Sequence, residues 1–324
     1  MRGFRKIVPF VAMFLLVACT AAPSPTPVSP TATAPFTVTP LPPTPTATAT
    51  PAPPTAVLMG VAGSYPDGSA AARAWIQALA QKQGYALVAV PPGKPLPPHT
   101  VVAVGVGVVP PAADGARRLV VAPPEQADLD GVQVLDPAPA SGPARAFLGG
   151  YIGVLVTKDW RAGLLAQEDE KGLAAAFEDG GRYFCGLCRP LHPPFLAYPQ
   201  YALVPSGAQG EVWQAAATRL VRNGVQTVAL SMGALAAGAD DALVAEKLHL
   251  IALTAPPPDR DAHLLAALEP DVAAGLDALW QDPALQRTGV PLRVEVFDAT
   301  LLTPGRQARV KEVQTLLQKG LIQP

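Results

Sequence analysis

Two cysteines separated by two residues, Cys185 and Cys188, have the spacing in this chain that points most directly to chemistry. A Cys-x-x-Cys motif acts as a redox pair when its first cysteine begins a helix, because the helix dipole stabilises the thiolate. Here a helical pattern precedes the motif, and the proline-rich run 189–194 follows it. We favour a structural disulfide, as is usual outside the cytoplasm; a redox site, and a metal site or free thiols, are the alternatives. His192 offers a third zinc ligand but the sequence shows no fourth nearby, so no metal is expected.

No hydrolase or nucleotide-binding motif stands out elsewhere. Ser231 follows an apolar strand, but the first glycine of a nucleophile elbow is missing, and no P-loop or His-Glu-x-x-His motif is present. The carboxylates at 168–170 fit either a cleft that binds a cation or sugar, or a solvated helix N-terminus. We favour the helix N-terminus, since acids suit that end of the helix dipole. Neither an enzyme nor a cofactor is expected.

The N-terminus resembles a bacterial lipoprotein signal. Arg2, Arg5 and Lys6 precede the uncharged apolar run 7–18, which ends at Cys19. A basic segment, a short apolar run and small residues before a cysteine match a lipobox, in which the thiol is acylated. An ordinary signal peptide with a chance cysteine is the alternative. We expect residues 1–18 to be a signal peptide, Cys19 to be lipidated, and the protein to lie outside the cytoplasm on a membrane.

A tether then leads to the folded part. Residues 19–55 are the expected lipidated cysteine and linker, almost entirely Pro, Thr, Ala and Ser after the cysteine, and no charge occurs between Lys6 and Asp67. Such a segment buries too little apolar surface to fold, and its prolines favour polyproline II. The folded part is expected at 56–324. Because the formal net charge of the chain is −1, nothing favours a nucleic-acid partner.

Short apolar runs alternate with helical patterns along 56–324, which predicts an α/β fold with parallel sheets in two doubly wound lobes. The predicted strands are 57–61, 85–90, 101–109, 118–121, 132–135, 163–166, 201–204, 227–230 and 249–253. The predicted helices are 69–83, 144–156, 171–184, 210–223, 239–247, 261–280 and 304–319. Glycines 149, 150 and 153 are expected to let the central helix pack closely.

Several motifs resemble the basic membrane protein family, lipoprotein receptors of ABC importers that often bind nucleosides. The run 146–158 is similar to the family's AFLAGYxAGLxTK helix, and 302–322 to its carboxyl end. Residues 67–69 with Trp75 resemble its Asp-x-Ser-Phe-Asn-x-x-x-Trp motif at the start of the first helix. Residues 102–107 resemble its VxGxGF-type strand end.

The resemblance implies a type I periplasmic-binding-protein fold with ligand at the carboxyl ends of the strands. Lobe one is expected at about 56–158 and 259–288. Lobe two is expected at about 159–258 and 299–324.

The departures from the family concern the ligand. Ala70 and Ala71 stand where the family has the Phe that stacks on a base and an Asn that makes polar contacts. Thr254 follows the strand after which the family has an Asp that holds ribose hydroxyls. We therefore expect weak binding of nucleosides.

The sequence thus predicts a lipid-anchored, extracytoplasmic protein that presents a small, mostly uncharged solute to an ABC permease. The alternative is a surface sensor or docking lipoprotein that has lost transport. The candidate ligand contacts, taken from strand ends, are Ser64, Tyr65, Asp67, Ser69, Gly105, Ser231, Met232 and Thr254.

Overall fold

The computed structural model describes residues 52–324, except 61–64, 171, 187–190, 193–195 and 258. The predicted signal peptide, Cys19 and nearly all of the linker lie outside the described residues, as do Ser64 and Cys188. The side chains of Asp67 and Cys185 lie outside them as well. The described residues belong to one compact unit, Pro51–Pro324.

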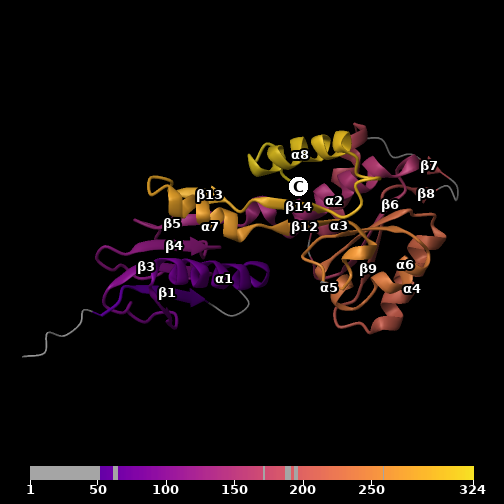
Figure 1. Cartoon of the computed structure of the whole chain (residues 1–324). Helices are drawn as coiled ribbons and strands as arrows, with labels where there is room; N and C mark the ends of the chain where they lie inside the picture. The colour runs from indigo at the N-terminus through magenta and orange to yellow at the C-terminus, as the bar shows by residue number, and fades with distance from the viewer. Residues whose placement is uncertain (1–51, 61–64, 171, 187–190, 193–195, 258) are drawn as a thin grey trace, which may run out of the picture. The chain divides into compact units, whose positions relative to one another are not determined.

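The first sheet has six strands, all parallel, in the order β13-β5-β4-β3-β1-β2 (Figure 1). Helices α1 (Pro66–Gln83) and α7 (Val272–Gln281) pack against this sheet and against each other. The strands are β1 (Thr55–Gly60), β2 (Ala86–Ala89), β3 (Thr100–Val106), β4 (Arg117–Val121), β5 (Gln133–Asp136) and β13 (Arg287–Gly289).

The second sheet also has six strands, in the order β14-β12-β11-β10-β6-β9, with β14 antiparallel at one edge. Its strands are β6 (Ala162–Gln167), β9 (Gln200–Val204), β10 (Thr227–Leu230), β11 (His249–Ala252), β12 (Leu264–Pro270) and β14 (Leu292–Val296). Its helices are α2 (Gly142–Val156), α3 (Leu173–Cys185), α4 (Gly210–Arg222), α5 (Met232–Ala236), α6 (Asp240–Ala245) and α8 (Pro304–Gln318). A short hairpin pairs β7 (Leu191–His192) with β8 (Leu196–Ala197).

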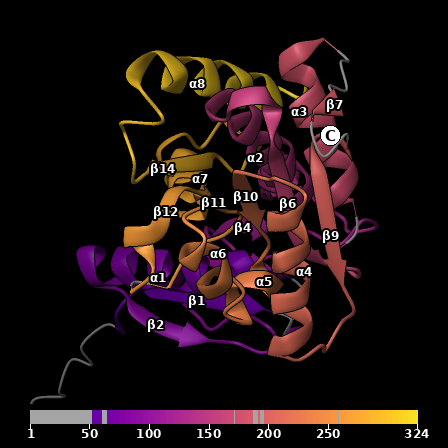
Figure 2. The same ribbon diagram turned by 90° about the vertical axis from the view of Figure 1, so that its right-hand side faces the viewer.

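The central strands of the second sheet, β6, β10, β11 and β12, are buried on both faces, which is why they are nearly continuous apolar runs rather than alternating ones. The edge strands β9 and β14 are partly exposed. In β6, Leu164 and Ala166 contribute to the core that contains α2 and α3, whereas Leu165 belongs to the core under α4 and α6. Figure 2 shows α4 running beside β9 at one edge of this sheet. The predicted α/β class with two parallel-sheet lobes is confirmed.

The predicted helix at 261–280 is wrong in its first half. A 3-10 turn at Asp261–His263 leads into β12, and only Val272–Gln281 is helical. The Leu/Ala-rich sequence of β12 contains no β-branched residue, and a short apolar run of this kind does not distinguish a strand from a helix. Pairing with β11 and β14 decides the outcome.

The lobes also divide the chain differently from the expected boundaries. Helix α2 contacts β6, β10 and α3, so 142–156 belongs with the second sheet. Strand β12, expected in lobe one, pairs in the second sheet, and only α7 and β13 of the segment 259–288 join the first.

Helices α2 and α3 pack with almost no space between their backbones, as the glycines of the sequence predict. A Cβ atom on Gly150 would lie 2.0 Å from the carbonyl oxygen of Phe177, and one on Gly180 would lie 1.9 Å from that of Phe147. The faces of α2 that do not contact α3 pack against the second sheet and α8, so the helix is buried along most of its length. None of the helices in the described part of the chain is long and apolar enough to span a bilayer.

Gly150→Ala tests this contact. Alanine normally stabilises a helix interior by about 1 kcal/mol relative to glycine. Here the added methyl group collides with Phe177, so we expect urea denaturation to show a net loss of about 1–3 kcal/mol in the free energy of unfolding.

The control is Gly305→Ala in the first turn of α8, where nothing lies within 4 Å of the added atom. That variant should be as stable as the wild type or slightly more so. Equal unfolding free energies for the two variants would show that the backbones of α2 and α3 are not held this closely.

Candidate ligand-binding site

A cavity of about 210 Å³ lies at the carboxyl edge of the second sheet. Neighbouring strands β6, β10 and β11 run parallel in register, so the residues that follow them gather at one edge. We call this space the Arg145 cavity. It is lined by Gly142, Pro143, Arg145, Glu170, Leu173, Ser231, Met232 and Leu253.

Arg145 lies in the first turn of α2 and is 8% exposed. Its Nη1 atom donates a hydrogen bond to the carbonyl oxygen of Leu253, at 2.6 Å, which ties the start of α2 to the end of β11. The first turn itself is capped by Ser141, whose Oγ accepts from the amide of Ala144. A rigid helix therefore presents a buried cation to the cavity.

Glu170 supplies a negative charge to the same cavity. Its Oε2 accepts from the amide of Gln167 at 2.8 Å, and its Oε1 from the amide of Gly233 at 3.4 Å. The carboxylate thus links the loop after β6 to the turn after β10. The side chain of Gln167 packs against Gly233, where a Cβ would lie 2.6 Å from it.

Two of the predicted contacts line this cavity in different ways. Ser231 is completely buried, and its Oγ accepts from the amide of Ala234, so it caps α5. Met232 is 47% exposed at the rim of the cavity.

A second cavity, of about 360 Å³, contains the positions at which the chain departs from the basic membrane protein family. Ala70 and Ala71 of α1 line it together with Thr254, Ala255 and the charged residues Glu269, Asp271 and Arg293. We call it the Thr254 cavity. Because Leu253 lines the Arg145 cavity, the two cavities adjoin at the end of β11.

An ion pair forms the polar wall of the Thr254 cavity. Glu269 and Arg293 are direct partners in the β12–β14 ladder, and the Arg293 guanidinium donates to the Glu269 carboxylate. This hydrogen bond raises the pKa of Arg293 above its usual value. Among the described residues that line this cavity none is aromatic, so they offer a base no ring to stack on.

The first sheet has a cavity of about 420 Å³ at its own carboxyl edge, lined in part by Gly60, Ser69, Arg73 and Val106. The predicted contact Ser69 therefore lies at such an edge. Gly105 has another role, since a Cβ there would lie 1.9 Å from the carbonyl oxygen of Val108 and tight packing requires the glycine.

Tyr65 precedes α1, and its ring lies so close to Gly68 that a Cβ on that glycine would sit 1.8 Å from it. Of the eight predicted contacts, the structure thus brings Ser231 and Met232 to one cavity, Thr254 to the adjoining one and Ser69 to the first sheet. Ser64 and the side chain of Asp67 lie outside the described residues.

Sequence reasoning missed Arg145, Glu269 and Arg293. Arg145 had a visible signal, since it is the only charged residue in the apolar sequence of α2. The expected helix N-terminus is wrong for the 168–170 carboxylates, because α3 begins at Leu173 and has no acidic residue in its first turn. Glu168 and Asp169 are exposed in the loop after β6, and Glu170 lines the cavity.

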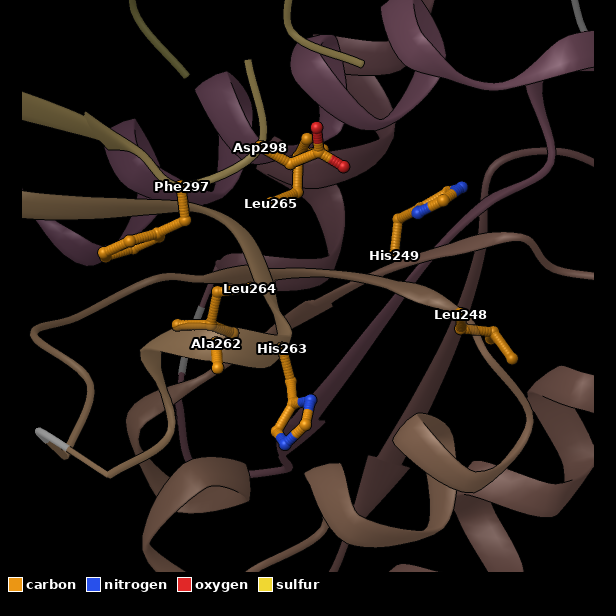
Figure 3. Close-up of a pocket in the computed structure, with 8 residues that line it drawn as sticks. All are labelled: Leu248, His249, Ala262, His263, Leu264, Leu265, Phe297 and Asp298. Atoms are coloured by element: carbon orange, nitrogen blue, oxygen red, sulfur yellow. The ribbon is translucent and has the colours of Figure 1, made fainter. Parts of the chain in front are cut away.

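A fourth cavity, of about 440 Å³, lies at the opposite, amino edge of the second sheet (Figure 3). It contains His249, His263 and Asp298, but Figure 3 shows the two imidazole rings pointing away from each other. In the described part of the chain no three His, Cys, Asp or Glu side chains group as a metal site requires. Ligands of open parallel sheets bind at the carboxyl edge, so this cavity is not the candidate site.

Cys185 is the last residue of α3, and Gly186 after it has the left-handed backbone that ends a helix. The motif thus follows a helix, as the sequence indicates, which argues against a thiolate stabilised by a helix N-terminus. The predicted Cys185–Cys188 disulfide lies outside the described residues.

No protein-family model matches the chain, and no curated protein sequence matches it. Among solved structures, it resembles an ABC transporter solute-binding protein from Conexibacter woesei at 14% identity and a TM-score of 0.52, covering 84% of this chain and 98% of that one. A solute-binding protein from Aeropyrum pernix is 9% identical with a TM-score of 0.51, and the match covers 84% of this chain and 94% of that one. A transcriptional activator of the comK gene from Bacillus halodurans is 11% identical with a TM-score of 0.53, and the match covers 82% of this chain and 98% of that one. The chain therefore has a type I periplasmic-binding-protein-like fold, which transport proteins and regulators share.

Asp298 in the fourth cavity yields a prediction about pH. The Asp298 carboxylate accepts from the hydroxyl of Thr300 at 2.6 Å and from the amides of Thr300 and Leu301, and the hydroxyl bond is the main cause of its lowered pKa. A carboxylate with a depressed folded pKa stabilises the protein above its unfolded pKa, and this contribution is lost as pH falls through the folded pKa. Asp298→Ala should therefore lower the melting temperature at neutral pH, and the difference from wild type should shrink in acid.

The control is Glu125→Ala, an exposed carboxylate in the loop after β4. It should show no such pH-dependent difference. A deficit for Asp298→Ala that stays constant from neutral to acid pH would rule out the charge as its origin.

Proposed function

We propose that the chain is a solute-binding lipoprotein of the basic membrane protein type, anchored outside the cytoplasm through Cys19. It delivers a small solute, uncharged overall, to an ABC permease and carries out no reaction itself. The observation that carries this proposal is the Arg145 cavity, a hollow at the carboxyl edge of a parallel sheet whose walls hold fixed polar groups. The fold of known solute-binding proteins and the lipobox-like N-terminus support it.

The ligand differs from a nucleoside in this proposal. Alanines at 70 and 71 leave the Thr254 cavity without a ring to stack on a base. Thr254 offers a hydroxyl where a carboxylate would hold ribose. Binding closes the lobes only if the solute has higher affinity for the closed state, so its polar groups have to match those that remain.

A surface sensor or partner-docking lipoprotein is the second candidate. The same small residues at 70, 71 and 254 favour it, because a protein that no longer transports a solute no longer needs the side chains that contact one. The fold is also that of a transcriptional activator.

Native mass spectrometry separates the two candidates. The full chain, purified in mild detergent from its host, should release a bound small molecule when conditions change from gentle to denaturing. That molecule should raise the melting temperature when added back to stripped protein, because a ligand of the folded state shifts unfolding by mass action. An empty protein that no nucleoside, sugar or amino acid stabilises would favour the sensor.

Met232→Arg should weaken binding of the released molecule at least about tenfold, roughly 1.4 kcal/mol, because it narrows the rim and adds a second cation beside Arg145. Val212→Arg is the matched control, since Val212 is an exposed apolar residue on α4. Equal affinities for the two variants, measured by calorimetry, would place the solute elsewhere.

Cys19→Ser tests the anchor. Without a thiol no lipid is attached, so the variant should leave the membrane fraction while its melting temperature stays that of the wild type. The mass of the N-terminal peptide checks acylation directly. Membrane association that survives the substitution would exclude Cys19 as the attachment point.

A further inference from the structure

Strand β14 has one side of its backbone turned away from the sheet. It forms an edge of the second sheet, and within the described residues its strand partner is β12. The amide of Phe297 donates to the carbonyl oxygen of Leu265, and the direction of the bonds alternates along an antiparallel ladder. The backbone amides and carbonyls of Leu292, Val294 and Val296 therefore point away from β12, towards the open edge.

The open edge is only partly satisfied by the rest of the described chain. The side-chain amide of Gln314 on α8 donates to the carbonyl oxygen of Leu292. No described residue forms a hydrogen bond with the outward backbone groups of Val294 and Val296. An edge strand with free main-chain groups accepts an extended segment of another chain as an added strand.

A groove of about 320 Å³ lies between this edge and α8. Figures 1 and 2 both show α8 beside β14. Side chains alternate along a strand, so Val294 and Val296 face the same side. An added strand would place every second side chain in the groove. The lining is mostly apolar: Val294, Val296, Leu302, Pro304, Gln307, Ala308, Val310, Lys311 and Gln314.

The helix side of this α8–β14 groove is basic. Helix α8 contains Arg306, Arg309 and Lys311, and Glu312 is its single acidic residue. Glu312 pairs with Arg309 at 3.3 Å, and Arg306 donates to a backbone carbonyl. Lys311 is exposed, lines the groove and has no ion-pair partner in the part of the chain that the structure describes. Its charge is therefore available to a carboxylate of an occupant.

We propose that the α8–β14 groove docks an extended acidic segment of a partner protein, which adds to β14 as a further strand. The backbone of the segment pairs with Val294 and Val296, its apolar side chains fill the groove, and a carboxylate meets Lys311. Side chains on its other face meet Arg293 and Glu295, whose charges are opposite. This inference goes beyond solute binding and does not depend on which solute is bound.

Two other occupants fit the groove less well. The linker of the chain has no charge between Lys6 and Asp67, so it offers Lys311 no carboxylate, and its many prolines have no amide to donate. An anionic bilayer would satisfy Lys311, but it has no backbone to pair with an edge strand. An acidic segment of a protein matches the edge, the apolar lining and the charge together.

A synthetic peptide tests the assignment on the full-length protein in mild detergent. The probe is fluorescently labelled acetyl-Glu-Thr-Val-Thr-Val-Thr-Glu-amide, whose valines and glutamates share one face of a strand. We expect saturable binding by fluorescence anisotropy. The same peptide with lysine in place of glutamate should bind at least about threefold more weakly, because it opposes Lys311 with a like charge.

Hydrogen exchange resolved to single amides reads the backbone pairing. The amides of Val294 and Val296 should exchange fast in the free protein and at least about tenfold more slowly when the peptide is bound. The amide of Glu295 is an internal control, since the alternation of the ladder directs it to β12. Its exchange should change little.

Lys311→Glu supplies the protein side of the test. This variant should bind the glutamate peptide more weakly and the lysine peptide more tightly than the wild type does, a reversal that a merely structural role would not produce. The matched control is Lys319→Glu, the same charge change at an exposed residue that follows α8 and lies outside the groove. Its affinity for both peptides should be that of the wild type.

Each contrary outcome overturns the inference. Neither peptide binding at millimolar concentration would do so, and so would equal affinity for the two peptides. Slow exchange of the Val294 and Val296 amides in the free protein would show that the linker or a second copy already fills the edge. Binding to anionic vesicles without binding to the peptide would assign the surface to lipid. The proposed solute-binding function is tested separately by native mass spectrometry. If Lys311→Glu fails to fold, the peptide pair and hydrogen exchange decide.

Discussion

The burial of α2 is the constraint on which the second lobe depends. This helix contacts the sheet, α3 and α8, and it approaches α3 so closely that Gly150 and Gly180 admit no side chain. A helix packed on so many sides is apolar along nearly its whole length, and any charge in it has to be useful or well paired. Arg145 is the single exception, at the end of the helix where the sheet edge opens into a cavity. The packing of α2 therefore fixes the position of the guanidinium.

Fold and site were predictable to different degrees because they leave different traces in sequence. Buried parallel strands such as β10 are β-branched runs between helical patterns, and their number and order suffice for the α/β class. Strand β12 was not predicted because its Leu/Ala composition suits a helix as well as a strand. Strand β13 has three residues and leaves almost no pattern in the sequence. Pairing with neighbours, which a single sequence does not display, decides such segments.

Residues at strand ends were the right place to look, but chemistry alone did not give their roles. Ser231 is a polar residue after a strand, yet its hydroxyl caps α5. Gly105 looked open to a ligand and is a glycine because Val108 packs against it. Arg145 lies far from any strand end in sequence and reaches the site only because α2 packs across the sheet. Contacts between distant segments decide which polar groups line a cavity.

The polar wall of the Thr254 cavity belongs to the framework of the second sheet. Glu269 and Arg293 lie on the strands by which the chain leaves for α7 and returns from β13. The crossings are short: Asp271 alone separates β12 from α7, and its amide donates to the carbonyl of Pro291. Glu269 is buried, so loss of Arg293 would leave an unpaired carboxylate in the interior at considerable cost. The polar wall of the Thr254 cavity is thus held in place by the pairing of β12 with β14 in the second sheet.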